Sequence, residues 1–153
     1  MRASIIVWAL TLPLILISPL IDAAWPGDPG APLEWEAQYT GMAEPLQKII
    51  SSQPDFLAVG NDLFPGRPLP DVDFKHNVAV CVCLGERRTG GYRIVFYSPY
   101  VSGGKLVIPY HEKRPSGMTT QALTQPCAMK IFEKKEGQLV QALRVADPDK
   151  NRR

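Results

Sequence analysis

An unbroken apolar run at Val78–Leu84 (VAVCVCL) predicts a β-strand that is buried on both faces, because its β-branched residues do not alternate with polar ones. The segment Tyr92–Phe96 alternates instead, which places Tyr92, Ile94 and Phe96 on one face of a second strand. The two strands and the short segment between them predict a β-hairpin.

The loop of this hairpin is rich in glycine, which supplies the positive φ angles that a turn requires, and its tip is charged. We interpret it as a candidate contact surface made of Gly85, Arg87, Arg88, Thr89, Gly90, Gly91 and Tyr92. Arg87 and Arg88 would donate hydrogen bonds to an acidic partner, and Tyr92 would be an aromatic anchor. The alternative is an ordinary turn, with Tyr92 packed on the sheet.

The region before this hairpin predicts two strands and a helix. Alternation over Glu34–Thr40 predicts the first strand, and Leu46–Ser51 predicts a short second one. Ser52 and Asp55, three residues apart with a proline between them, are typical of a helix N-terminus. The helix is expected to end near Asn61. Its core-facing residues would be Phe56, Leu57 and Val59.

The C-terminal half predicts more strands separated by turn signals. A strand is expected at Lys105–His111, where Pro109 favours a sheet edge or a bulge. A long polar loop at Arg114–Pro126 is expected beside the glycine-rich loop. Strands then follow at Cys127–Phe132 and Gln138–Val145, with a hairpin turn between them. The fold class is therefore mostly β (α+β), an antiparallel, sandwich-like domain with one short helix.

The N-terminus has the pattern of a secretory signal peptide over residues 1–23, with Arg2 before an apolar run and Ala23 at a small-residue cleavage site. The alternative is an uncleaved anchor. A Pro- and Gly-rich linker is expected at 24–33, the β-rich domain at 34–146 and a flexible basic tail at 147–153. This organisation predicts an exported protein, periplasmic or secreted, without a stable membrane span after cleavage.

The net charge of +2 provides no basic stripe for nucleic acid. Three cysteines are an odd number for an exported chain. Cys81 and Cys83 share one strand face at about 6.6 Å, which disfavours a bridge between them. A disulfide of Cys127 with Cys81 or Cys83 remains open. The two histidines lack ligand spacing, so no metal or cofactor is expected.

Catalytic patterns are absent from the sequence, which contains no nucleophile elbow and no paired-histidine helix. Asp71 and Asp73 lie two apart in a proline-rich loop, where capping or solvated roles are expected. Cys81 and Cys83 lie in a buried run, which disfavours a reactive thiolate. An enzyme or a small-ligand-binding domain is therefore the less favoured class.

Four short motifs, taken together, resemble the PrcB C-terminal domain family. They are LPDVDF at 69–74, LGER at 84–87, TGGY at 89–92 and LTQP at 123–126, within a resemblance that extends from Trp35 to Glu133. The family is named for a subunit of a bacterial surface protease complex. The resemblance implies an exported, non-catalytic protein–protein interaction module that is accessory to a protease or envelope complex. It does not identify the partner.

The chain departs from the family pattern at several positions. Arg88 replaces the proline that is usual before the threonine, and no lipid-attachment cysteine follows the apolar N-terminal run. The segment 89–92 is also similar to the threonine–glycine–tyrosine loop of chagasin-type cysteine-protease inhibitors, and Pro115 is similar to part of a second loop of that family. This resemblance implies the alternative function of a protease inhibitor.

Overall fold

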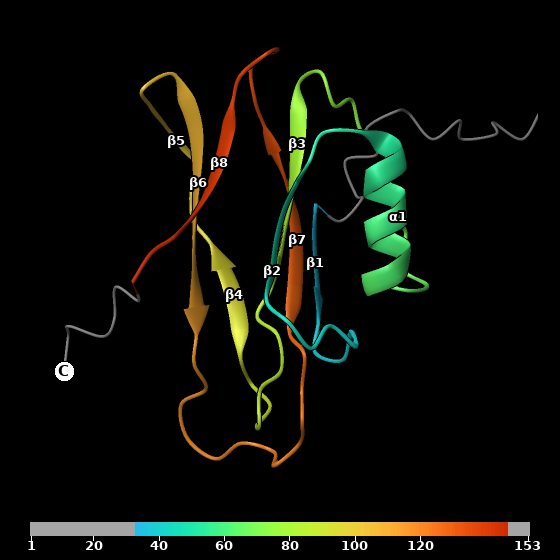
Figure 1. Ribbon diagram of the computed structural model, residues 1–153, viewed down its shortest axis with the longest axis vertical. Coiled ribbons are helices and arrows are strands. Elements are labelled where there is room, and N and C mark those ends of the chain that lie inside the picture. The colour runs from blue at the N-terminus through green and yellow to red at the C-terminus, as the bar shows by residue number, and fades with distance from the viewer. Residues whose placement is uncertain (1–32, 147–153) are drawn as a thin grey trace, which may run out of the picture.

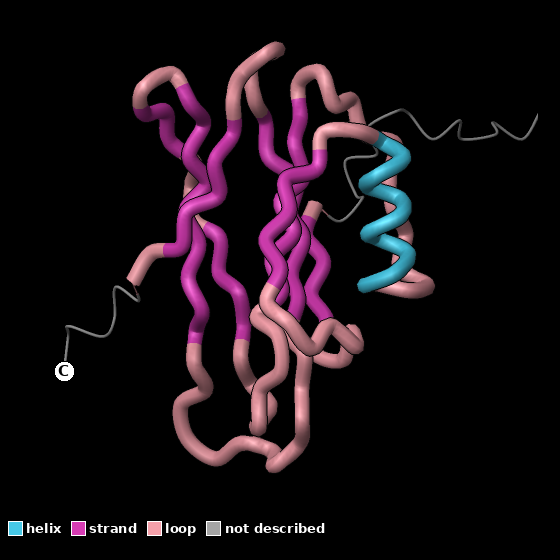
Figure 2. The backbone as a smooth tube through the Cα atoms, viewed as in Figure 1, coloured by secondary structure: helices cyan, strands magenta, loops and turns pink. Residues whose placement is uncertain are grey.

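Two four-stranded β-sheets lie face to face in the computed structural model, which describes residues 33–146 (Figures 1 and 2). The elements are β1 (Glu34–Ala37), β2 (Leu46–Ile50), α1 (Gln53–Leu63), β3 (Asn77–Cys83), β4 (Arg93–Phe96), β5 (Tyr100–Ser102), β6 (Lys105–Lys113), β7 (Cys127–Glu133) and β8 (Val140–Arg144). This mostly β architecture with one helix confirms the expected fold class. The predicted signal peptide, nearly all of the linker and the basic tail lie outside the described residues.

The first sheet has the order β1–β7–β3–β2, and all of its pairings are antiparallel. Its strand β3 is buried on both faces, as the apolar run predicts, since residues 78–83 are each no more than 2% exposed. Alternate residues of β3 point to opposite faces. One set packs between the two sheets, and the other packs beneath the helix.

The predicted hairpin between β3 and the next strand is wrong, because β3 and β4 belong to different sheets. β2 and β7 already pair with the two edges of β3, so no edge is left for β4. The chain therefore crosses from one sheet to the other through residues 84–92. The predicted hairpin after β7 is wrong for a similar reason. Strand β8 pairs in parallel with β6 of the second sheet.

Strand β6 is the centre of the second sheet. It pairs with β4 and β5 on one side and with β8 on the other. β5 is not predicted by the sequence pattern. The register along β6 shifts by one residue between β4 and β5, and Pro109 lies at this shift. A one-residue change of register is typical of a β-bulge, a place where the missing N–H of proline is tolerated within a sheet.

Helix α1 covers the face of the first sheet that points away from the second (Figure 1). Its predicted N-cap is present, since Ser52 Oγ accepts a hydrogen bond from the backbone N–H of Asp55 at 3.3 Å. The helix is two residues longer than predicted. Phe56 and Leu63 are buried on the side of the helix that faces the sheet. Leu57, which was expected in the core, is 37% exposed.

Two apolar cores result from this arrangement of three layers. The core between the sheets consists of Val78, Val80, Val82, Leu84, Ile94, Phe96, Leu106, Ile108, Tyr110, Ala128, Phe132 and Ala142. The core beneath the helix consists of Trp35, Ile50, Phe56, Leu63, Phe64, Ala79, Cys81, Cys83, Cys127 and Met129.

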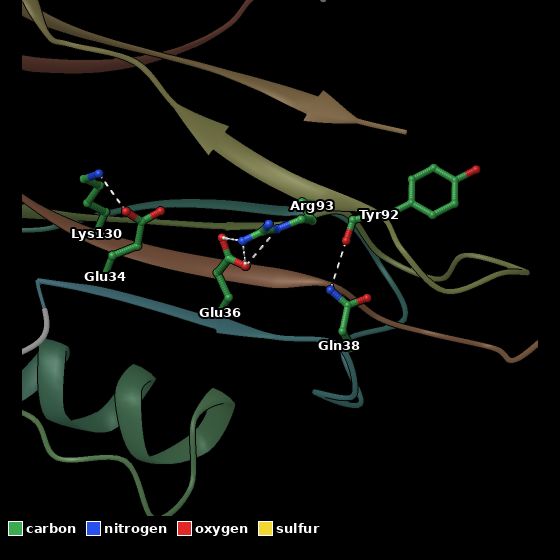
Figure 3. A network of polar contacts seen from close by, with 6 residues as sticks. All are labelled: Glu34, Glu36, Gln38, Tyr92, Arg93 and Lys130. Atoms are coloured by element: carbon green, nitrogen blue, oxygen red, sulfur yellow. Dashed lines mark hydrogen bonds and ion pairs between the residues drawn. The ribbon is translucent and has the colours of Figure 1, made fainter. Parts of the chain in front are cut away.

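Polar side chains join the sheets along the edge where β1 faces β4 (Figure 3). Arg93 of β4 binds both carboxylate oxygens of Glu36, the closer contact being 2.9 Å. Gln38 Nε2 donates to the carbonyl of Tyr92 at 3.0 Å. Since exposed ion pairs contribute at most about 1 kcal/mol each, this edge mainly fixes how the two sheets align. It also holds the end of the glycine-rich loop in place.

A disulfide joins Cys83 to Cys127, which are paired across β3 and β7. Cys81 remains a free, buried thiol on the same face of β3. Burial raises the pKa of Cys81 to about 12. The thiol is therefore protonated and unreactive in the folded protein at neutral pH.

We expect thiol alkylation to distinguish these three cysteines. At pH 8 only about one in ten thousand Cys81 thiols is ionised in the folded chain, so iodoacetamide should label none rapidly. Denaturation without reductant should expose one thiol, and denaturation with reductant three, counted by intact mass.

The variant Cys81→Ala is the control, because it should show no labelling after denaturation without reductant. Two or three labelled thiols in the unreduced, denatured chain would contradict the disulfide.

Candidate partner-binding tip

Two loops that are far apart in sequence lie together at one end of the sandwich, where Figure 2 shows loops gathered at the lower end. We call residues 85–92 and 114–126 the tip. Arg87 and Thr124 form an antiparallel bridge with two backbone hydrogen bonds of 2.8 Å. Gly90 N donates to the carbonyl of Thr120 at 3.0 Å. The structure thus brings the Arg114–Pro126 loop beside the glycine-rich loop.

Close packing explains two of the glycines. Gly85 has φ +75°, and a Cβ there would meet the carbonyl oxygen of Ala43 at 2.8 Å. Gly91 has φ +87°, and its Cβ would lie 3.0 Å from Cβ of Pro115. Residues with a side chain rarely adopt these positive φ angles, and at both glycines the space that a Cβ would need is also occupied. Gly85 is buried, so its place in the predicted contact surface is that of a turn.

Arg87 and Tyr92 are turned toward the body of the protein. The Arg87 guanidinium lies 3.1 Å from Glu112 and 5.5 Å from the centre of the Tyr92 ring. Tyr92 is half-buried against the core between the sheets. Both side chains are engaged within the domain, so neither is presented in the way that the sequence interpretation describes.

Arg88 is the exposed cation of the glycine-rich loop, and Arg114 is exposed at the start of the second loop. Lys113, the last residue of β6, is exposed directly before that loop. No acidic residue within 33–146 forms an ion pair with any of these three. Met118 is fully exposed. Lys113 and Met118 were not predicted as contact residues from the sequence, although a methionine in a Ser-, Gly- and Thr-rich loop is a detectable signal.

A hollow of about 320 Å³ lies between the two loops. It is lined by Gly90, Gly91, Pro115, Ser116, Met118, Thr119 and Thr120. The lining supplies hydroxyl groups and backbone but no acid or base that could activate them. Thr89, the remaining residue of the predicted surface, accepts a hydrogen bond on its carbonyl from Thr124 Oγ1 at 3.0 Å.

The two aspartates considered for acid–base chemistry lie away from the tip. Asp73 accepts hydrogen bonds from His76 Nδ1 at 2.7 Å and from the backbone N–H of Lys75 at 3.0 Å. The hydrogen bond from His76 is the main reason that the pKa of Asp73 is below its usual value. Asp73 thus stabilises the turn before β3. Residues 33–146 contain no group of three or more side chains suited to hold a metal ion.

The family comparison matches residues 78–133 to the family described as PrcB C-terminal. This match confirms the resemblance carried by the LGER, TGGY and LTQP motifs. It runs from β3 through both loops of the tip to the end of β7. The match suggests a family of subunits associated with protease complexes, and its name suggests a non-catalytic accessory role.

Comparison with curated proteins found no match, and comparison with solved structures found none. Within residues 33–146, no helix has both the length and the apolar character needed to cross a membrane.

The tip geometry predicts different costs for two glycine substitutions. Gly91→Ala and Gly117→Ala both place a Cβ on a backbone with φ near +90°, which costs about 1 kcal/mol or more. Only at Gly91 must Pro115 also move, because the space around Gly117 is open. We therefore expect Gly91→Ala to lower the free energy of unfolding more than Gly117→Ala does, measured by urea denaturation. Equal losses would contradict the packing of the two loops.

Proposed function

We propose that this protein is an exported, non-catalytic interaction module that binds a protein partner through the tip. The observation that carries the proposal is the pair of loops whose backbones are hydrogen-bonded to each other while their exposed side chains have no partner within the domain. A loop surface fixed before binding loses little conformational entropy when it meets a partner. The match to PrcB C-terminal supports a protease or envelope complex as the setting.

The chemistry of the tip favours an acidic partner surface. Arg88 and Arg114 of the tip, together with the adjacent Lys113, outnumber the exposed Glu86 and would attract it. Met118 would supply an adaptable apolar contact. Arg87 and Tyr92 support this surface from beneath, because the ring and the guanidinium pack on each other.

A protease inhibitor of the chagasin type is the second candidate. The proximity of Gly91 and Pro115, which line the same hollow, favours it, because these residues belong to the two segments that carry that resemblance. Both candidates use the same tip and differ in their effect on the partner. An accessory subunit would preserve or raise protease activity, whereas an inhibitor would lower it in proportion to its concentration.

We expect Arg88→Glu to lower partner binding by at least about tenfold, because it places a negative charge before an acidic surface. The measurement is affinity capture from envelope and secreted fractions of the source cells, followed by titration of the purified partner. Lys105→Glu is the matched control, since Lys105 is the exposed first residue of β6. That strand begins at the end of the sandwich opposite the tip (Figure 1).

The partner should bind the native protein and the Lys105→Glu variant equally. Equal retention by Arg88→Glu, or no partner in either fraction, would contradict the proposal. Peptidase assays with the captured partner then decide between the accessory and the inhibitory role.

A further inference from the structure

A second hollow, of about 210 Å³, opens at the edge of the sandwich where β2 and β8 face each other. It is lined by Pro45, Leu46, Gln47, Val82, Cys83, Leu84, Arg87, Tyr110 and Arg144. We call it the seam pocket. It lies opposite the polar edge of β1 and β4, and no residues of β2 and β8 are paired across it.

A space remains at this seam because β2 and β8 are not paired, and the side chain of Gln47 spans the gap between them. Gln47 Nε2 donates to the carbonyl of Ala142 at 3.2 Å, and Gln47 Oε1 accepts from the hydroxyl of Tyr110 at 2.7 Å. Burial raises the pKa of Tyr110, so this hydroxyl keeps its proton and continues to donate. The edges of β2 and β8 are thereby held together without closing the space beside Gln47.

The pocket has an apolar interior and a cationic rim. Val82 and Leu84, whose side chains belong to the core between the sheets, supply apolar surface that is continuous with the protein interior. Two guanidinium groups reach the same small space, that of Arg87 from the glycine-rich loop and that of Arg144 from β8. An apolar ligand with a negative group at one end matches this division.

Glu112 holds both guanidinium groups without lining the pocket itself. Its carboxylate binds Arg87 Nη2 at 3.1 Å and Arg144 Nη2 at 2.5 Å, and only 8% of its side chain is exposed. Two positive charges against one negative charge leave a net charge of +1 at the rim. Arg144 is 60% exposed and makes one described hydrogen bond, so it has further N–H donors for a ligand.

The volume shows that a small group fits inside the hollow. A space of 210 Å³ is equivalent to about seven water molecules at roughly 30 Å³ each, enough for one aliphatic side chain with its carboxylate. Planar guanidinium groups are suited to a carboxylate because they donate two parallel hydrogen bonds.

We propose that the seam pocket binds a small apolar carboxylate, with the aliphatic part against Val82 and Leu84 and the carboxylate at Arg144 and Arg87. Such a group occurs in free small acids and at the C-terminus of a peptide that ends in an aliphatic residue. The pocket shares Arg87 with the support of the tip, but the proposal does not rest on partner binding, because the exposed residues Arg88 and Met118 do not line the pocket.

The test is an NMR titration of the purified protein with N-acetyl-leucine and, as the matched neutral ligand, N-acetyl-leucinamide. We expect N-acetyl-leucine to shift the backbone amides of Leu46, Gln47, Val82 and Leu84. The neutral amide should bind about 10- to 100-fold more weakly, because it loses charge-assisted hydrogen bonds. Equal affinities, shifts confined to other residues, or no shifts would overturn the proposal.

Arg144→Gln should weaken N-acetyl-leucine binding about tenfold or more, whereas Lys105→Gln, which removes an equal charge elsewhere, should not. Thermal unfolding of both variants checks that the fold is kept. Unchanged binding by a folded Arg144→Gln variant would overturn the assignment of the carboxylate to the rim.

A short peptide ending in leucine, with a free or an amidated C-terminus, distinguishes the source of the carboxylate. Tighter binding of the free-acid peptide than of N-acetyl-leucine would support a polypeptide C-terminus, and equal binding a free small acid. Equal binding of the free and amidated peptides would overturn the proposal.

Discussion

The burial of β3 on both faces is the constraint on which the rest of the structure depends. A strand with apolar residues on both faces needs a layer on each side. The second sheet is one layer and α1 is the other. Because β2 and β7 occupy both edges of β3, the chain must leave the sheet after Cys83 and cross to the second sheet. The disulfide to Cys127 lies at this exit, and the first loop of the tip begins directly after it.

The positions of most strands follow from the sequence, whereas their pairing does not. Periodicity shows which face of a segment is buried, but it carries no information about which strand lies at its edge. The segments around β3 and β4 therefore predict a hairpin, and so do β7 and β8, although each pair is divided between the two sheets. The helix cap was predictable because Ser52 and Asp55 interact locally. Leu57 was misplaced because the direction of the stripe depends on what the helix packs against.

The same distinction between local and distant interactions applies to the candidate site. The glycines of the loop are recognisable in the sequence, and the structure supplies the reason for Gly85 and Gly91. The inward orientation of Arg87 depends on Glu112, which lies 25 residues away and carries no motif. The exposure of Met118 depends on how the second loop packs against the first. Contacts between distant segments therefore decide which side chains of the tip remain available.

Two neighbouring arginines differ because one of them, Arg87, binds Glu112. Arg87 forms the backbone bridge to Thr124, and its side chain extends inward to Glu112, while Arg88 is exposed at the tip. Glu112 also binds Arg144 of β8, so one mostly buried carboxylate connects the tip loop to the rim of the seam pocket. A mostly buried carboxylate is tolerated when cations and hydrogen bonds compensate its charge, and here two guanidinium groups do so. The support of the tip and the positive rim of the pocket thus have a common origin in this one ion-pair cluster.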